Sequence, residues 1–260
     1  MNFNFKNKNV FISGGTHGIG LACLLKFAEL QANVITFARD KKKINLTKKK
    51  LDKLTSGIDY LIGEGDILDI NFLKKFSKKV LKKYKTIDIL IHNVGGGGRW
   101  GKDNFLFTDS RVWKDVYDKN NNGLIIFTKY FLPSMLKNQW GRVIAIGSIL
   151  GFETTSKDRS WFSAAKAAQS AIIKSFSKKY YFTKKNITFN TISPGPIFIK
   201  NTGWDLNKKE IVRYVKKNIP TKNMGIPEDI ACMCVFLSSF NSSYINGSNI
   251  VIDGGYTNSF

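Results

Sequence analysis

The sequence predicts a single α/β domain spanning residues 1–260, built on a doubly wound parallel sheet of about seven strands. Seven short runs rich in Ile and Val alternate with longer amphipathic stretches. Strands that are buried on both faces of a sheet show such near-continuous apolar runs. No linker, repeat or low-complexity segment divides the chain. Repeating strand–helix units of this kind form one parallel sheet with helices on both faces.

The strands expected from these runs are, in chain order, 9–13, 33–37, 58–62, 87–92, 142–147, 187–193 and 249–253. Helical stretches separate them, for example 21–30 and 71–84. In the second stretch, five apolar side chains share one face at helical spacing: Phe72, Leu73, Phe76, Val80 and Leu81. Lysines occupy the opposite face, so the pattern predicts a helix packed on the sheet.

The composition indicates a globular chain with an unusual charge. Apolar residues make up 43% of the 260 residues, and the formal net charge is +22. Such a charge can mark a nucleic-acid binder. Here the lysines are scattered over every predicted helix, and Lys, Asn, Ile and Phe share A/T-rich codons, so genome composition accounts for the excess. We expect no specific nucleic-acid partner, while anionic ligands fit the charge. The lysine runs at 41–43 and 48–50 are expected to be solvated helix faces.

Several features predict a cytoplasmic protein with no membrane partner. No apolar run approaches the length of a membrane span, and the N-terminal residues lack the apolar core of a signal peptide. The three cysteines, Cys23, Cys232 and Cys234, are too few and too badly spaced for a disulfide framework. We expect Cys232 and Cys234 to be buried, inert thiols, and we expect no metal site.

A glycine-rich turn follows the first expected strand and reads SGGTHGIG at residues 13–20. A turn of this kind between a strand and a helix lets backbone N–H groups approach a pyrophosphate, as in Rossmann-type dinucleotide sites. Gly14 makes the tight turn, Gly18 allows the close approach and Gly20 lets the helix pack on the sheet. The expected cofactor-binding residues of this turn are Ser13, Gly14, Gly15, His17, Gly18, Ile19 and Gly20.

The end of the second strand indicates which dinucleotide binds. Sites for NAD often place an acidic residue there to bind the ribose 2′-hydroxyl, but this chain has Ala38 followed by Arg39. A guanidinium suits a 2′-phosphate, and His17 offers a second donor, so NADP(H) is favoured over NAD(H). Asp66, just after the third strand, suits the adenine amino group, and its neighbour Ile67 belongs to the same expected site.

Further motifs make the whole chain resemble the short-chain dehydrogenase/reductase family, and within it the 3-oxoacyl-carrier-protein reductases. HNVG at 92–95 is similar to the NNAG motif of that family, with Asn93 and Gly95 matching. The stretches 113–123 and 141–151 resemble the segments that carry a catalytic Asn and a catalytic Ser, which places these residues at Asn120 and Ser148. SPGPI at 193–197 resembles the segment that packs on the nicotinamide, which implies roles for Pro194, Gly195 and Ile197.

The last motif of the family, YxxxK, reads FSAAK here, with Phe162 at the tyrosine position and Lys166 as the lysine. Spacing of four residues puts both side chains on one helix face. The resemblance implies that Lys166 binds the cofactor ribose, that Ser148 holds the substrate oxygen and that Asn120 holds a proton-relay water. Phe162 cannot act as acid or base, because its ring has no donor. The Trp161 indole N–H could orient a carbonyl but would not readily release a proton, and Glu153 and Asp158 are the remaining acids near this motif.

The resemblance implies an NADP(H)-dependent oxidoreductase acting on a carbonyl/alcohol pair of a polar or anionic small molecule. Segments 95–105, 152–161 and 198–210 would form the substrate pocket, and 198–210 is expected to be a mobile lid. They carry four basic residues and three tryptophans: Arg99, Lys157, Arg159, Lys200, Trp100, Trp161 and Trp204. A cofactor-binding pseudoenzyme or regulatory subunit is the alternative. The family also implies a homotetramer or homodimer, assembled through the central helices and the last strand.

Overall fold

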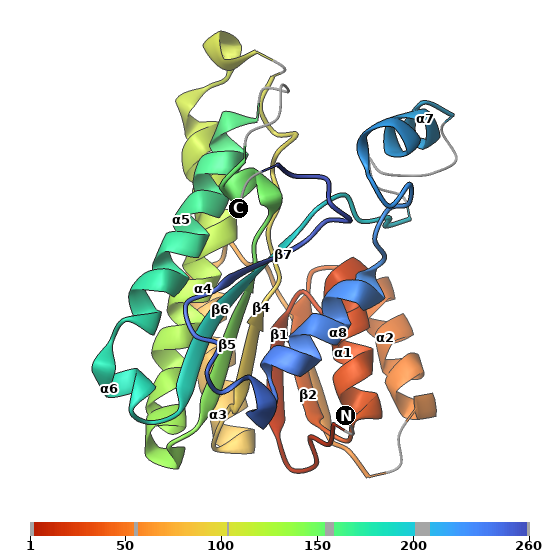
Figure 1. The fold of residues 1–260 in the computed structure, drawn as a ribbon. Coiled ribbons are helices and arrows are strands. Elements are labelled where there is room, and N and C mark those ends of the chain that lie inside the picture. Colours follow the sequence, from red (N-terminus) through yellow and green to blue (C-terminus); the bar gives the residue numbers. More distant parts are fainter. Residues whose placement is uncertain (1–2, 55–56, 103, 154–158, 201–208, 259–260) are drawn as a thin grey trace.

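The computed structural model describes residues 3–54, 57–102, 104–153, 159–200 and 209–258. Within these residues the chain forms one sheet of seven parallel strands, in the order β3-β2-β1-β4-β5-β6-β7 (Figure 1). This confirms the predicted fold class. The strands are β1 Asn9–Ser13, β2 Asn33–Ala38, β3 Tyr60–Glu64, β4 Ile89–His92, β5 Gly141–Ile146, β6 Ile187–Pro194 and β7 Asn249–Ile252.

The third strand lies two residues later than predicted. In the sequence the apolar run ends before Gly63, a residue that usually weakens a strand. In the structure Gly63 pairs with Phe37 and Glu64 pairs with Ala38, which extends β3 to Glu64. A Cβ atom at Gly63 would lie 2.5 Å from the ring of Phe76, so the missing side chain makes room for the helix that covers this strand.

Helices cover both faces of the sheet (Figure 1). Helices α1, α2 and α8 pack on one face and α3, α4 and α5 pack on the other. The helices are α1 Gly18–Glu29, α2 Lys41–Leu54, α3 Ile70–Tyr84, α4 Ser110–Asn138, α5 Ser160–Ser177, α6 Tyr180–Thr183, α7 Lys209–Asn218 and α8 Pro227–Leu237. Short 3-10 turns are η1 Phe105–Phe107, η2 Ile149–Gly151 and η3 Phe240–Ser242.

Successive side chains of a strand point to opposite faces, so each strand supplies both cores. In β1, Val10 and Ile12 join the core beneath α1 and α8, and Phe11 joins the core beneath α3 and α4. The second core is rich in aromatic rings. Phe11 lies with its ring centroid 4.6 Å from that of Phe127 and 4.9 Å from that of Phe131.

Two smaller expectations can now be checked. The predicted apolar face of α3 packs inward, with Leu73, Phe76 and Val80 buried. Cys234 is buried as expected, but Cys232 is exposed, because it lies on the outer face of α8.

In the described part of the chain, none of the helices combines the length and the apolar character that a membrane crossing requires. The same residues hold no cluster of three potential metal ligands.

The strand order places a crevice above the middle of the sheet. The chain runs outward from β1 to β2 and β3, and then returns to β4 on the other side of β1. The connections after β1 and β4 therefore diverge at the carboxyl ends of these two neighbouring strands. Doubly wound sheets bind their ligands at such a point.

Candidate active site

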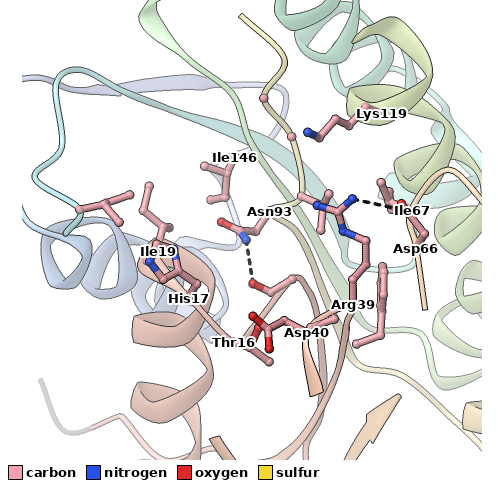
Figure 2. Close-up of a pocket in the computed structure, with 18 of the residues that line it drawn as sticks. Thr16, His17, Ile19, Arg39, Asp40, Asp66, Ile67, Asn93, Lys119 and Ile146 are labelled. Atoms are coloured by element: carbon pink, nitrogen blue, oxygen red, sulfur yellow. Dashed lines mark hydrogen bonds and ion pairs between the residues drawn. The ribbon is translucent and has the colours of Figure 1, made fainter. Parts of the chain in front are cut away.

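A pocket of about 640 Å³ opens at this crevice (Figure 2). Its walls come from the glycine turn, the ends of β2 and β3, the loop after β4, the end of β5 and helix α5. The structure gathers here twelve residues that the sequence singled out: Gly14, His17, Gly18, Ile19, Arg39, Asp66, Ile67, Asn93, Gly95, Phe162, Lys166 and Ile197.

Other predicted site residues are not among those that line the pocket. They are Ser13, Gly15, Gly20, Asn120, Ser148, Pro194 and Gly195. A Cβ atom at Gly15 would lie 2.7 Å from the Thr36 hydroxyl, and one at Gly20 would clash with the carbonyl oxygen of Gly14. These two glycines therefore shape the turn through close packing against their neighbours.

The glycine turn leaves the start of α1 open to the pocket. Gly14 and Gly18 have φ angles of +70° and +53°, a conformation that favours glycine. His17 is the N-cap residue, and its side chain makes no capping hydrogen bond. The first N–H groups of a helix have no partner within the helix and attract anions. The residues present thus fit the pyrophosphate of a dinucleotide.

Arg39 and Asp66 face each other across one end of the pocket (Figure 2). The Arg39 Nη1 atom lies 3.3 Å from the Asp66 Oδ2 atom, and the Arg39 side chain is 71% exposed. Solvent reaches this ion pair, so it costs a ligand little to displace it. Both groups are therefore available to the adenosine end of a cofactor.

Two lysines at this end were not found from the sequence. Lys43 belongs to the run taken for a solvated helix face, and Lys119 directly precedes Asn120. Burial, and then repulsion by Arg39, lowers the pKa of Lys119, whose Nζ atom lies 4.1 Å from the centroid of the Trp100 ring. Partial burial, and then Lys43, lowers the pKa of His17. Cationic groups thus converge on the pocket.

A buried hydrogen-bond chain runs beneath the pocket floor. The Ser13 hydroxyl accepts from the backbone N–H groups of Asn93 and Val94, at 2.9 Å each. It lies 3.3 Å from His92 Nδ1, while His92 Nε2 lies 2.9 Å from the carbonyl oxygen of Asn120. A carbonyl only accepts, so Nε2 carries the ring proton and Nδ1 accepts from Ser13. Burial lowers the pKa of His92 to about 3, which keeps this ring neutral.

Asn120 is saturated by its neighbours. Its side-chain Nδ2 donates to the carbonyl oxygens of Gly96 and Val116, at 2.8 and 2.7 Å. The backbone carbonyl oxygen of Asn120 accepts from His92 Nε2 and from Gln169 Nε2, at 2.9 Å each. A carbonyl oxygen has two lone pairs, and these two donors fill them. A proton-relay water on this backbone carbonyl oxygen would have to displace one of these two donors, so the role expected of Asn120 stays a prediction.

Lys166 is buried at the pocket wall, with only 3% of its surface exposed. Its Nζ atom donates to the carbonyl oxygen of Ile146 at 2.7 Å and to Gln169 Oε1 at 3.1 Å. A Cβ atom at Gly95 would lie 2.9 Å from Nζ, so glycine is needed for the loop to pass this close. Burial lowers the pKa of Lys166 to about 7.

Ser148 lies two residues after Ile146, whose carbonyl oxygen accepts from Lys166, and Phe162 lies one helical turn before Lys166 on α5. Ser148 follows Gly147 of the pocket wall, and its hydroxyl accepts from the Leu150 N–H at 3.2 Å, so its own proton remains free to donate. Phe162 lines the pocket, and its ring centroid lies 5.9 Å from Lys166 Nζ.

The other groups considered as proton sources are engaged elsewhere. The Trp161 side chain is buried, and its indole N–H donates to the Gly97 carbonyl oxygen at 3.2 Å. The ring packs inward between α4 and α5, so this N–H is not available to orient a substrate carbonyl. The Glu153 carboxylate accepts from the backbone N–H of Asn258 at 3.1 Å. Asp158 lies outside the described residues.

The expected substrate segments are only partly described. Trp100 lines the pocket, and Arg99 and Lys200 are exposed at the surface. Arg159 is half-buried at the start of α5. Lys157, Trp204 and most of the expected lid, residues 201–208, lie outside the described residues.

The fold, the glycine turn and the open helix start define a Rossmann-type dinucleotide-binding protein. A sequence model of the family described as "Enoyl-(Acyl carrier protein) reductase" matches residues 14–257. The chain is 32% identical over 261 residues to the 3-oxoacyl-(acyl-carrier-protein) reductase FabG of Buchnera aphidicola subsp. Acyrthosiphon pisum, covering 97% of this chain and 98% of that protein. The FabG protein of Buchnera aphidicola subsp. Schizaphis graminum is 30% identical over 252 residues, which cover 96% and 97% of the two chains.

The solved structure of YwfH, described as an NADPH dependent reductase involved in bacilysin biosynthesis, superposes with a TM-score of 0.89. It is 25% identical and covers 97% of this chain and 99% of its own. The chain belongs to the short-chain dehydrogenase/reductase family, and it is an oxidoreductase of that family.

Proposed function

We propose that the protein is an NADP(H)-dependent reductase of a carbonyl group on a polar or anionic small molecule. The observation that carries the cofactor preference is the position of Arg39, at the pocket wall directly after Ala38 at the end of β2. A guanidinium offers a planar pair of donors to a 2′-phosphate. Lys43 and His17 line the same end of the pocket and add positive charge or a further donor.

The names of the relatives support the direction of the reaction and the substrate class. The Buchnera proteins are 3-oxoacyl-(acyl-carrier-protein) reductases, and YwfH is an NADPH dependent reductase. A ketone linked to a phosphate-bearing carrier is anionic. The exposed cations Arg99 and Lys200 suit such a substrate, and Trp100 offers it a flat apolar wall.

Each residue of the site would have its own role in binding the cofactor or the substrate. A nicotinamide dinucleotide, when bound, exchanges a hydride with the substrate carbon. The turn at Gly14 and Gly18 would hold its pyrophosphate, while Ile197 with the Pro194–Gly195 pair would pack against the nicotinamide. Ser148 would hold the substrate oxygen through its free proton. Lys166 would bind the ribose. The N-terminal half would thus hold the adenosine and pyrophosphate of the cofactor, and the C-terminal half would serve the nicotinamide end, the substrate and assembly.

Phe162 would occupy the place at which the family carries its catalytic tyrosine. Its ring packs in the pocket wall but has no hydroxyl. A general acid typically contributes about 10²- to 10⁴-fold in rate, so its loss slows a reaction without abolishing it. We therefore expect slow but measurable reduction.

Titration of nicotinamide fluorescence tests the cofactor preference. Wild type should bind NADPH more tightly than NADH. Arg39→Ala should weaken NADPH by about 10- to 100-fold, corresponding to about 1.5–3 kcal/mol for a charge-assisted hydrogen bond, and should leave NADH nearly unchanged. Arg213→Ala, which removes an exposed arginine from α7, is the matched control. Equal binding of the two cofactors by wild type would refute the preference.

A panel of carbonyl compounds that includes β-keto thioesters tests the activity. Wild type should reduce at least one of them with NADPH, and Phe162→Tyr should raise kcat by at least about tenfold. If wild type binds NADPH yet neither protein turns over any carbonyl, a non-catalytic, cofactor-binding role becomes the better conclusion. A slower Phe162→Tyr enzyme would mean that the site is built around phenylalanine.

A further inference from the structure

The floor of the pocket is closed at the point where a water would have to bind. His92 and Gln169 both donate to the Asn120 carbonyl oxygen, at 2.9 Å each. These side chains come from β4 and α5 and are buried on all sides. A water that relays a proton to the pocket from this carbonyl oxygen would have to replace His92 or Gln169 as a donor. Breaking either of these buried hydrogen bonds is costly.

The Lys166 ammonium has one N–H group left for the pocket. An ammonium carries three donors. Among the described residues, Ile146 and Gln169 accept two of them, at 2.7 and 3.1 Å. Because Lys166 also lines the pocket, a ligand bound there is the natural acceptor for the third. Gln169 orients the ammonium, since its amide oxygen binds Lys166 while its amide nitrogen is fixed on Asn120.

We propose that Lys166 turns its third N–H to the substrate oxygen instead of the cofactor ribose, that it donates the proton of the reduction, and that Gln169 is the positioning residue that holds the ammonium for this transfer. This inference rests on the proposed function. The Phe162 ring beside Nζ carries no hydroxyl that would compete for this role. Ser148 would hold the substrate oxygen through a hydrogen bond, but among the described residues its hydroxyl has no bond to a basic side chain that would let it release its proton.

The step is balanced in the direction of reduction. The substrate carbon gains a hydride from the nicotinamide and is reduced, and the nicotinamide is oxidised. The π electron pair of the carbonyl moves to oxygen. An Nζ–H bond of Lys166 breaks, an O–H bond forms and the lysine becomes a neutral amine. The amine regains its proton from solvent after the product leaves.

The surroundings of Lys166 favour a neutral amine after the transfer. No carboxylate among the described residues bonds to Nζ, whose acceptors are uncharged. His92, on β4, is neutral because burial lowers its pKa to about 3. The other titratable groups of the described pocket wall are His17, Arg39, Asp40, Lys43, Asp66 and Lys119. Burial lowers the pKa of Lys166 itself to about 7, within the range that suits a general acid.

The pH dependence of kcat tests the proposal with the full-length enzyme, NADPH and a β-keto thioester. Wild-type kcat for reduction should fall as the pH rises above about 7, because the donor loses its proton. Gln169→Glu places a carboxylate beside the ammonium, so the fall should move up by at least about one pH unit. Gln169→Leu removes an acceptor of the charged form, so the fall should move down. A purely structural role of Gln169 would lower kcat at every pH and leave the midpoint in place.

A second readout needs neither cofactor nor activity. The lysine side-chain NMR resonance that disappears in Lys166→Met should titrate far below the other lysines, and it should move upward in Gln169→Glu. NADPH affinity should stay within about threefold in both Gln169 variants. This inference alone would be overturned if wild type turns over but neither Gln169 variant moves the pH midpoint of kcat. It would also be overturned if the Lys166 resonance titrates with an ordinary lysine pKa. Absence of turnover and of NADPH binding by wild type would overturn the proposed function and this inference with it.

Discussion

Among single residues, His92 shows most clearly how burial sets the charge of a group. The ring is fully buried, and it has a donor and an acceptor in place for its neutral form. Burial lowers its pKa to about 3, whereas the unfolded chain has a histidine pKa of about 6.5. Between these values the unfolded state binds a proton that the native state does not. The free energy of unfolding should therefore fall with decreasing pH, by up to about 1.4 kcal/mol per unit.

Urea unfolding at pH 7 and pH 4.5 checks this contribution. His92→Asn should be less stable than wild type at pH 7, by about 1–3 kcal/mol for the lost buried hydrogen bonds, but should lose less stability on acidification. His17, the other of the two histidines, is exposed, so His17→Asn should behave much like wild type. An equal acid loss in wild type and His92→Asn would contradict the assignment.

Among single residues, the sequence predicted the pocket residues that belong to motifs. It did not predict the buried residues that hydrogen-bond to them. Arg39, Asp66 and Lys166 follow from their places after strands or in a motif, and they line the pocket. Gln169 belongs to no motif, although its position three residues after Lys166 puts both on one helix face. The departure of His92 from the family motif was visible, but its meaning depends on the contact with Asn120, 28 residues away.

Among the elements, α3 and β3 fit together through paired glycines and phenylalanines. A Cβ atom at Gly63 would lie 2.5 Å from the Phe76 ring, and one at Gly65 would clash with the Phe72 ring. The two phenylalanine rings are stacked, with centroids 5.4 Å apart. The helix therefore rests on the strand at two points that lack a side chain.

A double-mutant cycle measures this fit. Gly63→Ala should lower the free energy of unfolding by about 1–3 kcal/mol through overpacking. Phe76→Leu removes the atoms that the new methyl would meet, so the double variant should lose less than the sum of the single losses, with a coupling of at least about 0.5 kcal/mol. Combining Gly63→Ala with Phe127→Leu serves as the control, because Phe127 is not among the nearest neighbours of a Cβ at Gly63. Additive losses in the Gly63–Phe76 pair would show that β3 relaxes away from the helix.

The same glycines explain where element prediction succeeded and where it did not. Apolar runs located all seven strands of the described sheet, because most strand positions face one of the two cores and are apolar. The end of β3 was missed because Gly63 reads as a strand breaker, while its actual role is set by a ring from another element. Long-range packing of this kind leaves no local signal.

At the scale of the whole molecule, part of the net charge of +22 lies around the pocket. Most lysines of α2 and α3 are exposed, but Lys43, Lys119 and Arg39 border the pocket. Like charges that converge on a cleft raise the local concentration of anions and speed their association. Whatever the origin of the lysine excess, the cations that border this pocket thus favour the binding of anions there.

The surface also indicates how copies of the chain meet. Strand β7 lies at one edge of the sheet, where no further strand of the described residues pairs with it, and Val251 on this strand is 38% exposed. On α5 the exposed face carries small residues at helical spacing, Ala164, Ala167 and Ala171, which allow another helix to approach closely. Members of this family usually form oligomers, and these two surfaces suit contacts with two-fold symmetry.

We therefore predict a homodimer or homotetramer in which β7 pairs with β7 of a second copy. Val251→Arg would place two cations beside each other across such an axis, so it should reduce the assembly to a smaller species. Val212→Arg on α7 is the control, because Val212 is the same residue type with a similar exposure of 36%. Multi-angle light scattering at micromolar concentration gives the masses. A monomeric wild type would refute the prediction, and an unchanged mass for Val251→Arg would move the interface away from β7 to the alanine face of α5.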